Sequence, residues 1–136
     1  MVLRQDFEKL CEEIKSCKRC ILSETRKNAI CGEGNTKAKL MIIAQAPGET
    51  EDQGDQMFIG PSGEVLDRLL NKVEVSREDI YMTNLLKCML PKCRRPKQSE
   101  IDACSEFLDK EIELIDPETL VPLGYYTTKN ILERYN

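Results

Sequence analysis

Three short apolar runs alternate with helical patterns along most of the chain, and this alternation constrains the fold more than any other feature. The runs cover residues 39–44, 79–83 and 119–123, and turn-forming residues follow the first and the third. Strands that alternate with helices usually form a parallel sheet by right-handed crossovers, with helices on both faces. The sequence therefore predicts an α/β fold, a three-layer α/β/α sandwich with a short parallel sheet of three strands.

Four segments have the apolar spacing of an amphipathic helix. The first ends just before Cys17, and the second begins with Ser62 as its expected N-cap. The third begins with Ser99 and Asp102 as a capping box, and the last begins near Thr128. The apolar residues expected to face the core are Leu3, Phe7, Leu10, Cys11, Ile14, Val65, Leu66, Leu69, Leu70, Val73, Ile101, Cys104, Leu108, Ile112, Ile115, Ile131, Leu132 and Tyr135.

Length and composition fit one globular domain over residues 1–136. The amino-terminal residues lack the apolar core of a signal peptide, and no run is long enough to span a membrane, so we expect a cytoplasmic protein with no membrane partner. The chain contains no histidine, which excludes Cys₂His₂ zinc sites and any Ser-His-Asp or Cys-His arrangement within it. Chemistry must come from carboxylates, amides, backbone groups or a metal.

Seven cysteines are many for a chain of this length. In a reducing compartment they indicate metal or redox chemistry rather than a disulfide framework. Cys17 and Cys20 form a C-x₂-C pair at the end of a helix, which is half of a metal site. A redox dithiol is the competing interpretation, although such pairs usually open a helix. Spacing alone does not choose the other ligands among Cys88, Cys93 and Cys104, and Cys104 also fits a buried core thiol.

Residues 87–97 form a basic loop. The segment reads KCMLPKCRRPK and has five basic residues and no acidic one, whereas the whole chain has a net charge of −4. Such a loop can contact a phosphate backbone, although a solvated surface loop is the simpler alternative. The predicted DNA-contacting residues are Lys87, Lys92, Arg94, Arg95 and Lys97.

Two loops leave the carboxyl edge of the predicted sheet, where ligands of α/β folds usually bind. One follows Ala44 and the other follows Asn84. The motifs in these loops, taken in order with the cysteines, are the C-x₂-C pair, APGETED, Phe58-Ile59-Gly60, TNLLKC and a later helical cysteine. This order resembles the iron–sulfur (family 4) uracil-DNA glycosylases, and the resemblance runs from about residue 10 to residue 124.

The resemblance implies a structural [4Fe-4S] cluster held by Cys17, Cys20, Cys88 and Cys104, with Cys93 as an extra thiol. Such a cluster would tie the end of the first helix to the loop after the second strand and to the third long helix. A Cys₄ zinc site is the alternative cofactor.

The resemblance also assigns a uracil pocket at the carboxyl edge of the sheet. Gln45 and Ala46 would present backbone groups to a uracil carbonyl, Phe58 would stack on the base, and Asn84 would read its pairing edge. Glu51 would be a pocket wall or a water-polarising carboxylate. Without the family, Asn84 would be a turn residue and Phe58 a core residue. The implied reaction is hydrolysis of the bond between deoxyribose and uracil in DNA, as in base excision repair.

Two features depart from the family pattern. Ala44 and Gln45 stand where members usually carry glycine and glutamate. The family's His-Pro-Ser loop and last strand are also expected after the final helix, but this chain has no histidine. The chain is then either a truncated copy or a short relative, and a non-catalytic, cluster-containing nucleic-acid binding protein is the alternative function. A sheet incomplete at its carboxyl end would expose an edge, which predicts self-association.

Overall fold

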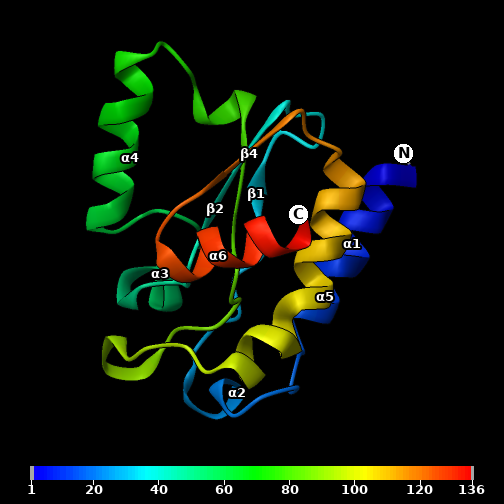
Figure 1. The fold of residues 1–136 in the computed structure, drawn as a ribbon, viewed down its shortest axis with the longest axis vertical. Helices are drawn as coiled ribbons and strands as arrows, with labels where there is room; N and C mark the ends of the chain where they lie inside the picture. Colours follow the sequence, from blue (N-terminus) through cyan, green and yellow to red (C-terminus); the bar gives the residue numbers. More distant parts are fainter. Residues whose placement is uncertain (1, 136) are drawn as a thin grey trace.

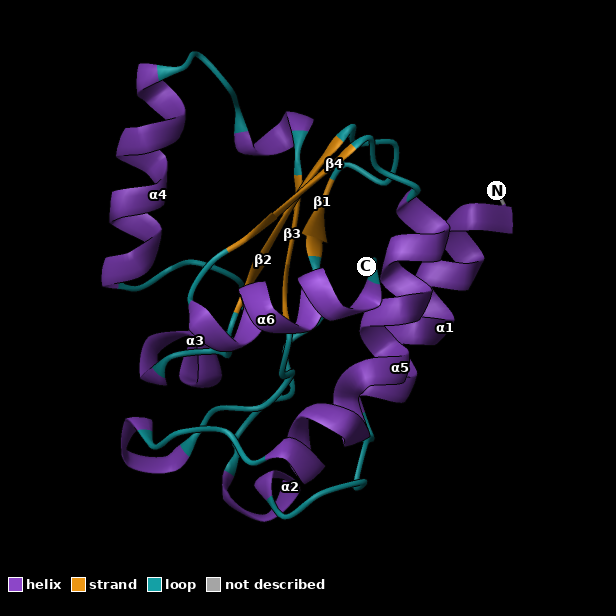
Figure 2. Cartoon of the chain, in the orientation of Figure 1, coloured by secondary structure: helices purple, strands orange, loops and turns teal. Residues whose placement is uncertain are grey.

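The structure is a computed structural model that describes residues 2–135. Its centre is a sheet of four strands in the order β1-β3-β2-β4, which are β1 Glu33–Gly34, β2 Leu40–Ala44, β3 Tyr81–Asn84 and β4 Thr119–Pro122 (Figure 2). β2 pairs in parallel with β3 and with β4, whereas β1 pairs antiparallel with β3. The three predicted strands are thus confirmed as the parallel part of the sheet.

Helices cover both faces of this sheet (Figure 1). α1, α5 and α6 lie on one side, and α4 lies on the other. Short 3₁₀ turns occur at Arg77–Asp79 and Pro91–Cys93. In residues 2–135, no helix combines the length and the apolar character that a membrane span needs. The helices are α1 Val2–Lys15, α2 Leu22–Thr25, α3 Glu49–Gly54, α4 Pro61–Lys72, α5 Gln98–Ile115 and α6 Tyr125–Arg134.

Alternate residues of β2 face two separate cores, as the period of a strand requires. Met41 and Ile43 pack with Tyr81 in the core shared with α1, α5 and α6. Ile42 packs with Met82 in the core beneath α4. Ile42 is 5% exposed, and the other four of these strand residues are at most 3% exposed. The predicted α/β class and its helices on both faces are therefore confirmed.

The antiparallel strand β1 was not predicted. It has only two residues and no apolar pattern, so periodicity could not indicate it. Gly34 permits the pairing because its φ is +127° and a Cβ there would lie 2.1 Å from the carbonyl oxygen of Ile80. One edge of the sheet is thus formed by an antiparallel strand and not by a parallel one.

Three predicted helix starts are wrong by a few residues. α4 begins at Pro61 after Gly60, so Ser62 lies inside the first turn and gives no capping bond. α5 begins at Gln98, and the Glu100 carboxylate, not that of Asp102, accepts the Lys97 N–H at 2.8 Å. α6 begins at Tyr125, directly after the turn at Gly124. Short polar side chains near a terminus compete for the cap, and spacing alone did not rank them.

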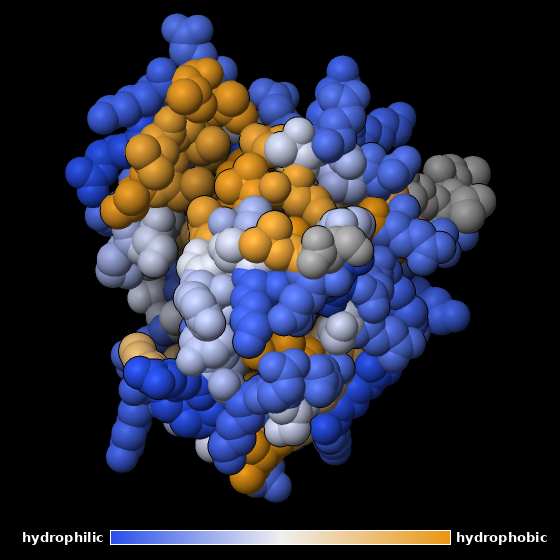
Figure 3. All heavy atoms as spheres, viewed as in Figure 1, coloured by the Kyte–Doolittle hydropathy of each residue, from blue (hydrophilic) through white to orange (hydrophobic). Residues whose placement is uncertain are grey.

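Two predicted core stripes are only partly buried. Leu66 and Leu70 of α4 are buried, but Val65, Leu69 and Val73 are 49%, 56% and 66% exposed. In α6, Ile131 is buried, whereas Leu132 and Tyr135 are 65% and 60% exposed. Figure 3 shows an apolar surface that runs from α4 onto the neighbouring part of the sheet. We call the exposed residues Val65, Leu69 and Val73 the α4 apolar face.

One disulfide is present, although the sequence favoured metal or redox chemistry over a disulfide framework. Cys11 of α1 is bonded to Cys31 in the segment before β1, with their Cα atoms 5.5 Å apart. Covalent bonding thereby ties the first helix to the start of the sheet. Cys17, Cys20, Cys88, Cys93 and Cys104 are free.

Candidate functional site

The carboxyl ends of β2 and β3 are held together beyond the sheet itself. Ala44 is opposite Asn84 in the parallel register. The ladder then continues, because the Leu85 N–H donates to the Ala44 carbonyl at 2.8 Å and the Leu86 N–H donates to the Gln45 carbonyl at 2.9 Å. The two loops expected to form the site therefore leave the sheet side by side.

A cavity of about 480 Å³ lies between these two loops. One wall is formed by residues 45–49, which follow β2, and the other by Met89, Leu90, Lys92, Cys93 and Arg94. Gln45 and Ala46 thus lie where the sequence predicted them, opposite the basic loop. Phe58 and Asn84 are not among the residues that line this cavity.

Glu51 organises the loop after β2. Its side chain is only 8% exposed. One carboxylate oxygen accepts the Gly48 N–H at 3.1 Å, and the other accepts the Ile59 and Gly60 N–H groups at 2.9 and 2.6 Å. The carboxylate therefore joins the start of α3 to the segment before α4. In this structure Glu51 positions backbone groups.

Asn84 and Phe58 are both buried and meet the same residue, Met57. Asn84 is 2% exposed, and its Nδ2 atom donates to Met57 Sδ at 3.3 Å. Phe58 is 7% exposed and packs in the core beneath α4. Its φ is +51°, and its carbonyl accepts from Arg77 Nη2 at 2.7 Å.

Gly63 lets α4 approach this turn. A Cβ at Gly63 would lie 1.8 Å from the Phe58 carbonyl oxygen, so only glycine fits there. Arg77 also donates to the Gly63 carbonyl at 3.3 Å. Arg77 and Gly63 together hold the Phe58 turn in its left-handed conformation.

Three of the predicted DNA-contacting side chains, Lys92, Arg95 and Lys97, are exposed. Arg94 is partly exposed, and its guanidinium makes two bonds to Glu100, at 2.8 and 2.5 Å. Glu100 is buried at the start of α5. This pair fixes the end of the basic loop to the helix, while the other three cations face solvent.

The Arg94–Glu100 pair predicts a pH-dependent stability. The hydrogen bond from Arg94 lowers the pKa of Glu100, and burial opposes that shift only in part. A carboxyl whose pKa is lowered on folding stabilises the protein above its unfolded pKa, about 4.3, and loses this contribution as the pH falls through the folded value. We expect the urea midpoint of Glu100→Gln to lie below that of the parent at neutral pH. Well below about pH 4, the two midpoints should lie closer together. Glu133→Gln, at an exposed position of α6, is the control. An equal loss at both pH values would contradict this account.

Lys87 is buried, so it is not part of the exposed basic surface that was predicted to contact DNA. Its side chain is 1% exposed and forms an ion pair with the buried Glu111. Its Nζ atom also donates to Thr83 Oγ1 at 2.6 Å and to the Asn84 carbonyl at 2.8 Å. Glu111 accepts further bonds from the Tyr81 hydroxyl at 2.7 Å and the Thr83 hydroxyl at 3.0 Å. This buried network supports the end of β3 from which Asn84 projects.

Four free cysteines gather around one end of the larger core. Cys88 and Cys104 are each 3% exposed, and Cys17 and Cys20 are partly buried against the same core. Cys17 and Cys20 lie in the segment between α1 and α2, Cys88 lies in the loop after β3, and Cys104 lies in the middle of α5. Cys93 is exposed and is not part of this core.

The thiols of this group act on one another electrostatically. Burial raises the pKa of Cys88; a hydrogen bond from Arg26 opposes the rise, and Cys20 and Cys17 add to it. Burial raises the pKa of Cys104 to about 11, and Cys88 and Cys20 contribute to that rise. Within residues 2–135, however, no group of three or more Cys, Asp or Glu side chains has the spacing that a single metal ion requires. The fold brings the four thiols into one region without forming a ready single-ion site.

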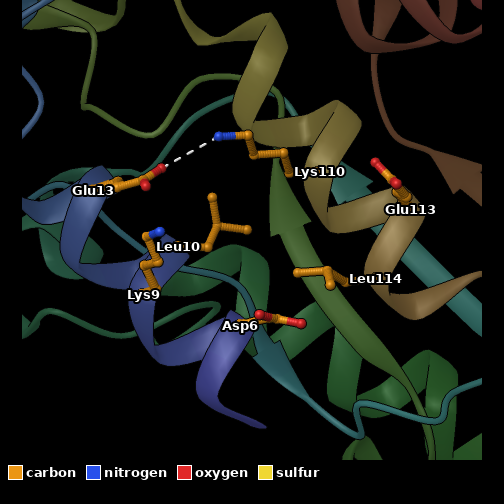
Figure 4. Close-up of a pocket in the computed structure, with 7 residues that line it drawn as sticks. All are labelled: Asp6, Lys9, Leu10, Glu13, Lys110, Glu113 and Leu114. Atoms are coloured by element: carbon orange, nitrogen blue, oxygen red, sulfur yellow. Dashed lines mark hydrogen bonds and ion pairs between the residues drawn. The ribbon is translucent and has the colours of Figure 1, made fainter. Parts of the chain in front are cut away.

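A second cavity, of about 210 Å³, lies between α1 and α5 (Figure 4). Acidic and basic side chains surround it, and Lys110 of α5 reaches across to Glu13 of α1 at 3.4 Å. None of the predicted site residues lines this cavity. The mixture of acidic and basic side chains is typical of a solvent-filled gap between two packed helices.

Comparison with known proteins decides the family. The model of the uracil DNA glycosylase superfamily matches residues 31–135, which include both loops of the site.

 Two of the four clustered thiols, Cys88 and Cys104, thus lie within the match, and the other two precede it. The chain belongs to this superfamily. Its α/β fold and the motifs at the carboxyl edge of its sheet agree with that membership.

Several type-4 uracil-DNA glycosylases are similar to this chain over nearly the whole length of the chain. The protein of Saccharolobus solfataricus is 42% identical over 132 residues, which are 96% of this chain and 61% of that protein. The protein of Sulfurisphaera tokodaii is 41% identical over 129 residues, 94% of this chain and 59% of that protein. The protein of Thermotoga maritima is 38% identical over 125 residues, 91% of this chain and 65% of that protein. The chain therefore spans about six tenths of the length of these relatives.

Several residues that shape the site were not predicted. Arg26 donates to Cys88 Sγ, and Glu111 accepts the bonds that hold Lys87 in the core. The carboxylate of Asp52 accepts the Lys27 and Asn28 N–H groups at 2.9 and 3.1 Å, which ties α3 to the segment after α2. Each of these contacts joins residues far apart in the sequence, so no local pattern could indicate them.

Proposed function

We propose that this chain is a uracil-DNA glycosylase, which hydrolyses the N-glycosidic bond of deoxyuridine in DNA and takes part in DNA repair. Membership in the superfamily supports this function. The structural observation that carries it is the position of Asn84, held at the carboxyl end of β3 beside the exit of β2. The proposal places the protein in the cytoplasm, with uracil-containing DNA as its partner.

Asn84 has the chemistry needed to recognise uracil. Its side-chain amide offers a donor and an acceptor on adjacent atoms, which match the O4 and N3–H groups of uracil and mismatch cytosine. In this structure its Nδ2 atom is bonded only weakly, to a thioether sulfur. We infer that a flipped base takes the place of Met57 and that Phe58, next to it, stacks on the base.

The remaining pocket groups would act through the backbone. Gln45 and Ala46 line the cavity beside Asn84's strand and would present backbone groups to a uracil carbonyl. Glu51 would keep the loop that carries them in place, through its bonds to Gly48, Ile59 and Gly60. Donors arranged in this way stabilise negative charge on the departing uracil.

Replacing Asn84 tests the assigned pocket. We expect Asn84→Ala to lower the single-turnover rate of uracil release by about 10²–10³-fold, the loss typical of removing one preorganised donor. The matched control is Asn71→Ala, at an exposed position of α4, which should react like the parent. Thermal unfolding of each variant separates loss of chemistry from loss of fold. A fully active, folded Asn84→Ala protein would contradict the role of Asn84.

We further propose that Cys17, Cys20, Cys88 and Cys104 hold a [4Fe-4S] cluster. Their shared position at one end of the larger core supports this set, as does the exclusion of Cys11 and Cys31 by their disulfide. Cys93 is exposed and separate. The cluster would cross-link the segments after α1 and β3 to α5 and so stabilise a small domain. A zinc ion bound by the same thiols is the alternative, and elemental analysis distinguishes the two.

The basic loop would contact DNA next to the pocket. Lys92 and Arg94 line the cavity, and Arg95 and Lys97 follow them along the same segment. Phosphate contacts of this kind would position the duplex without reading its sequence. The same loop also fits the alternative function, a non-catalytic nucleic-acid binding protein that contains a cluster.

We also propose that the chain self-associates beside β4. Among the described residues β4 pairs only with β2, and the α4 apolar face lies on the same side of the molecule (Figure 3). A second copy of the chain can complement such a surface through a two-fold axis. Pro122 removes one backbone donor from the strand, so the apolar face would contribute more than strand pairing.

Sedimentation tests this association. We expect the parent chain to form dimers, and Leu69→Glu to shift the population to monomers because it places a charge on the α4 apolar face. Ile21→Glu, at a 59% exposed position beside α2, is the matched control and should leave the dimer intact. A parent that is monomeric at all concentrations would contradict the proposal.

A further inference from the structure

Arg26 occupies a fixed position beside the clustered thiols. It is the C-cap residue of α2, and its N–H donates to the Leu22 carbonyl at 3.1 Å. Its side chain is partly buried. The short helix α2 follows the C-x₂-C pair directly, so the backbone that positions Arg26 is continuous with the backbone that positions Cys20.

The Arg26 guanidinium joins two of the segments that supply thiols. Its Nη1 atom donates to Cys88 Sγ at 3.0 Å. Its Nη2 atom donates to the Cys17 carbonyl at 2.6 Å and to the Lys15 carbonyl at 3.3 Å. One planar group therefore binds the thiol after β3 and the backbone that carries the first thiol of the pair. Arginine suits this contact because its donors form a rigid fork, which a lysine ammonium cannot reproduce.

A second arginine in the same region makes no contact of this kind. The Arg19 guanidinium lies 4.6 Å from the centre of the Phe107 ring and bonds to Glu106 at 2.9 Å. Its charge is thus directed to a carboxylate and an aromatic ring. Arg19 and Arg26 carry the same charge close to the thiols, but only Arg26 has a side-chain donor on a sulfur.

We infer that Arg26 is a positioning residue for the cluster, which holds Cys88 against the Cys17 segment and donates a hydrogen bond to the Cys88 sulfur. This inference rests on the proposed cluster. Hydrogen bonds to ligand sulfurs help to set the reduction potential of iron–sulfur clusters, and outer contacts of a metal site orient its ligands. Arg26 would therefore affect both how long the cluster is retained and how easily it is oxidised.

The experiment compares the parent chain with Arg26→Gln, Arg26→Lys and Arg19→Gln after anaerobic reconstitution with iron and sulfide. Iron content, the decay of visible absorbance in air and the midpoint potential are measured. We expect Arg26→Gln to lose its cluster roughly tenfold faster, the lower end of the range for outer contacts of metal sites. Its midpoint potential should become more negative, because a donor and a positive charge are removed from the sulfur. The decay rate and midpoint potential of Arg26→Lys should lie between those of Arg26→Gln and the parent. Those of Arg19→Gln should equal the values of the parent.

The outcomes separate this inference from the proposed cofactor. A parent that binds no iron contradicts the cluster itself. A parent that binds iron, together with an Arg26→Gln protein of unchanged decay rate and potential, overturns the role of Arg26 alone. If Arg26→Gln does not fold, Arg26→Lys decides, since parent-like decay and potential in that variant would equally overturn the inference. Equal changes of decay rate and midpoint potential in Arg19→Gln and Arg26→Gln would also overturn the inference. Such changes would come from the loss of a positive charge near the thiols and not from the hydrogen bond to Cys88.

Discussion

Replacing Lys87 by methionine will cost about 3–5 kcal/mol in the free energy of unfolding, the loss typical of breaking a buried ion pair by removing one partner. The Glu111 carboxylate would then be buried without its cation, and the Asn84 carbonyl and the Thr83 hydroxyl would each lose a bond. Urea unfolding at neutral pH measures this loss.

Two further variants show whether the loss comes from the buried pair. Lys87→Met combined with Glu111→Leu removes both charges, and such replacements are often neutral or stabilising, so we expect the double variant to recover much of the stability. Lys92→Met, at an exposed position of the basic loop, should change stability by less than about 0.5 kcal/mol. A Lys87→Met protein as stable as Lys92→Met would show that the network contributes little.

Replacing Cys104 by alanine will remove the bound iron. Cys104 is the only clustered thiol in α5, so its loss would leave the proposed cluster without its attachment to that helix. We expect retention of iron to weaken by more than about 100-fold, beyond the effect of changing an outer contact. Iron analysis and visible absorbance of the purified variant measure this loss.

The control for this experiment is Cys93→Ala. Cys93 lies on the exposed basic loop, outside the core that holds the four clustered thiols. Its variant should keep the iron content and colour of the parent. The reverse result, with iron lost from Cys93→Ala and kept by Cys104→Ala, would overturn the proposed ligand set.

The parallel part of the fold was predictable because it depends on local patterns. Buried runs of strand length and amphipathic spacing are properties of neighbouring residues, and they indicated β2, β3, β4 and the long helices. β1 could not be predicted, since its two residues are fixed by pairing with β3 and by Gly34. The exposure of Leu69 and Leu132 was also missed, because an apolar stripe does not show how much of it a neighbour covers.

The site was predictable in its location and less so in its contacts. The exits of β2 and β3 place Gln45 and Asn84 at one edge of the sheet, which follows from parallel topology. Lys87 was predicted to contact DNA because its neighbours are basic, but a partner 24 residues away, Glu111, holds it in the core. The disulfide likewise joins residues that no short motif connects. Contacts between residues far apart in the sequence therefore determine the features of the site that charge and spacing could not predict.

Release of free uracil by the parent chain tests the proposed function most directly. Under single-turnover conditions, the chain is incubated with duplexes that are identical except for one deoxyuridine, thymidine or deoxycytidine, and the released bases are identified by mass spectrometry. The proposed pocket predicts release of uracil alone, since the Asn84 amide matches the pairing edge of uracil and mismatches that of cytosine. Tight binding of the deoxyuridine duplex without release of uracil would contradict the glycosylase function and favour a binding protein.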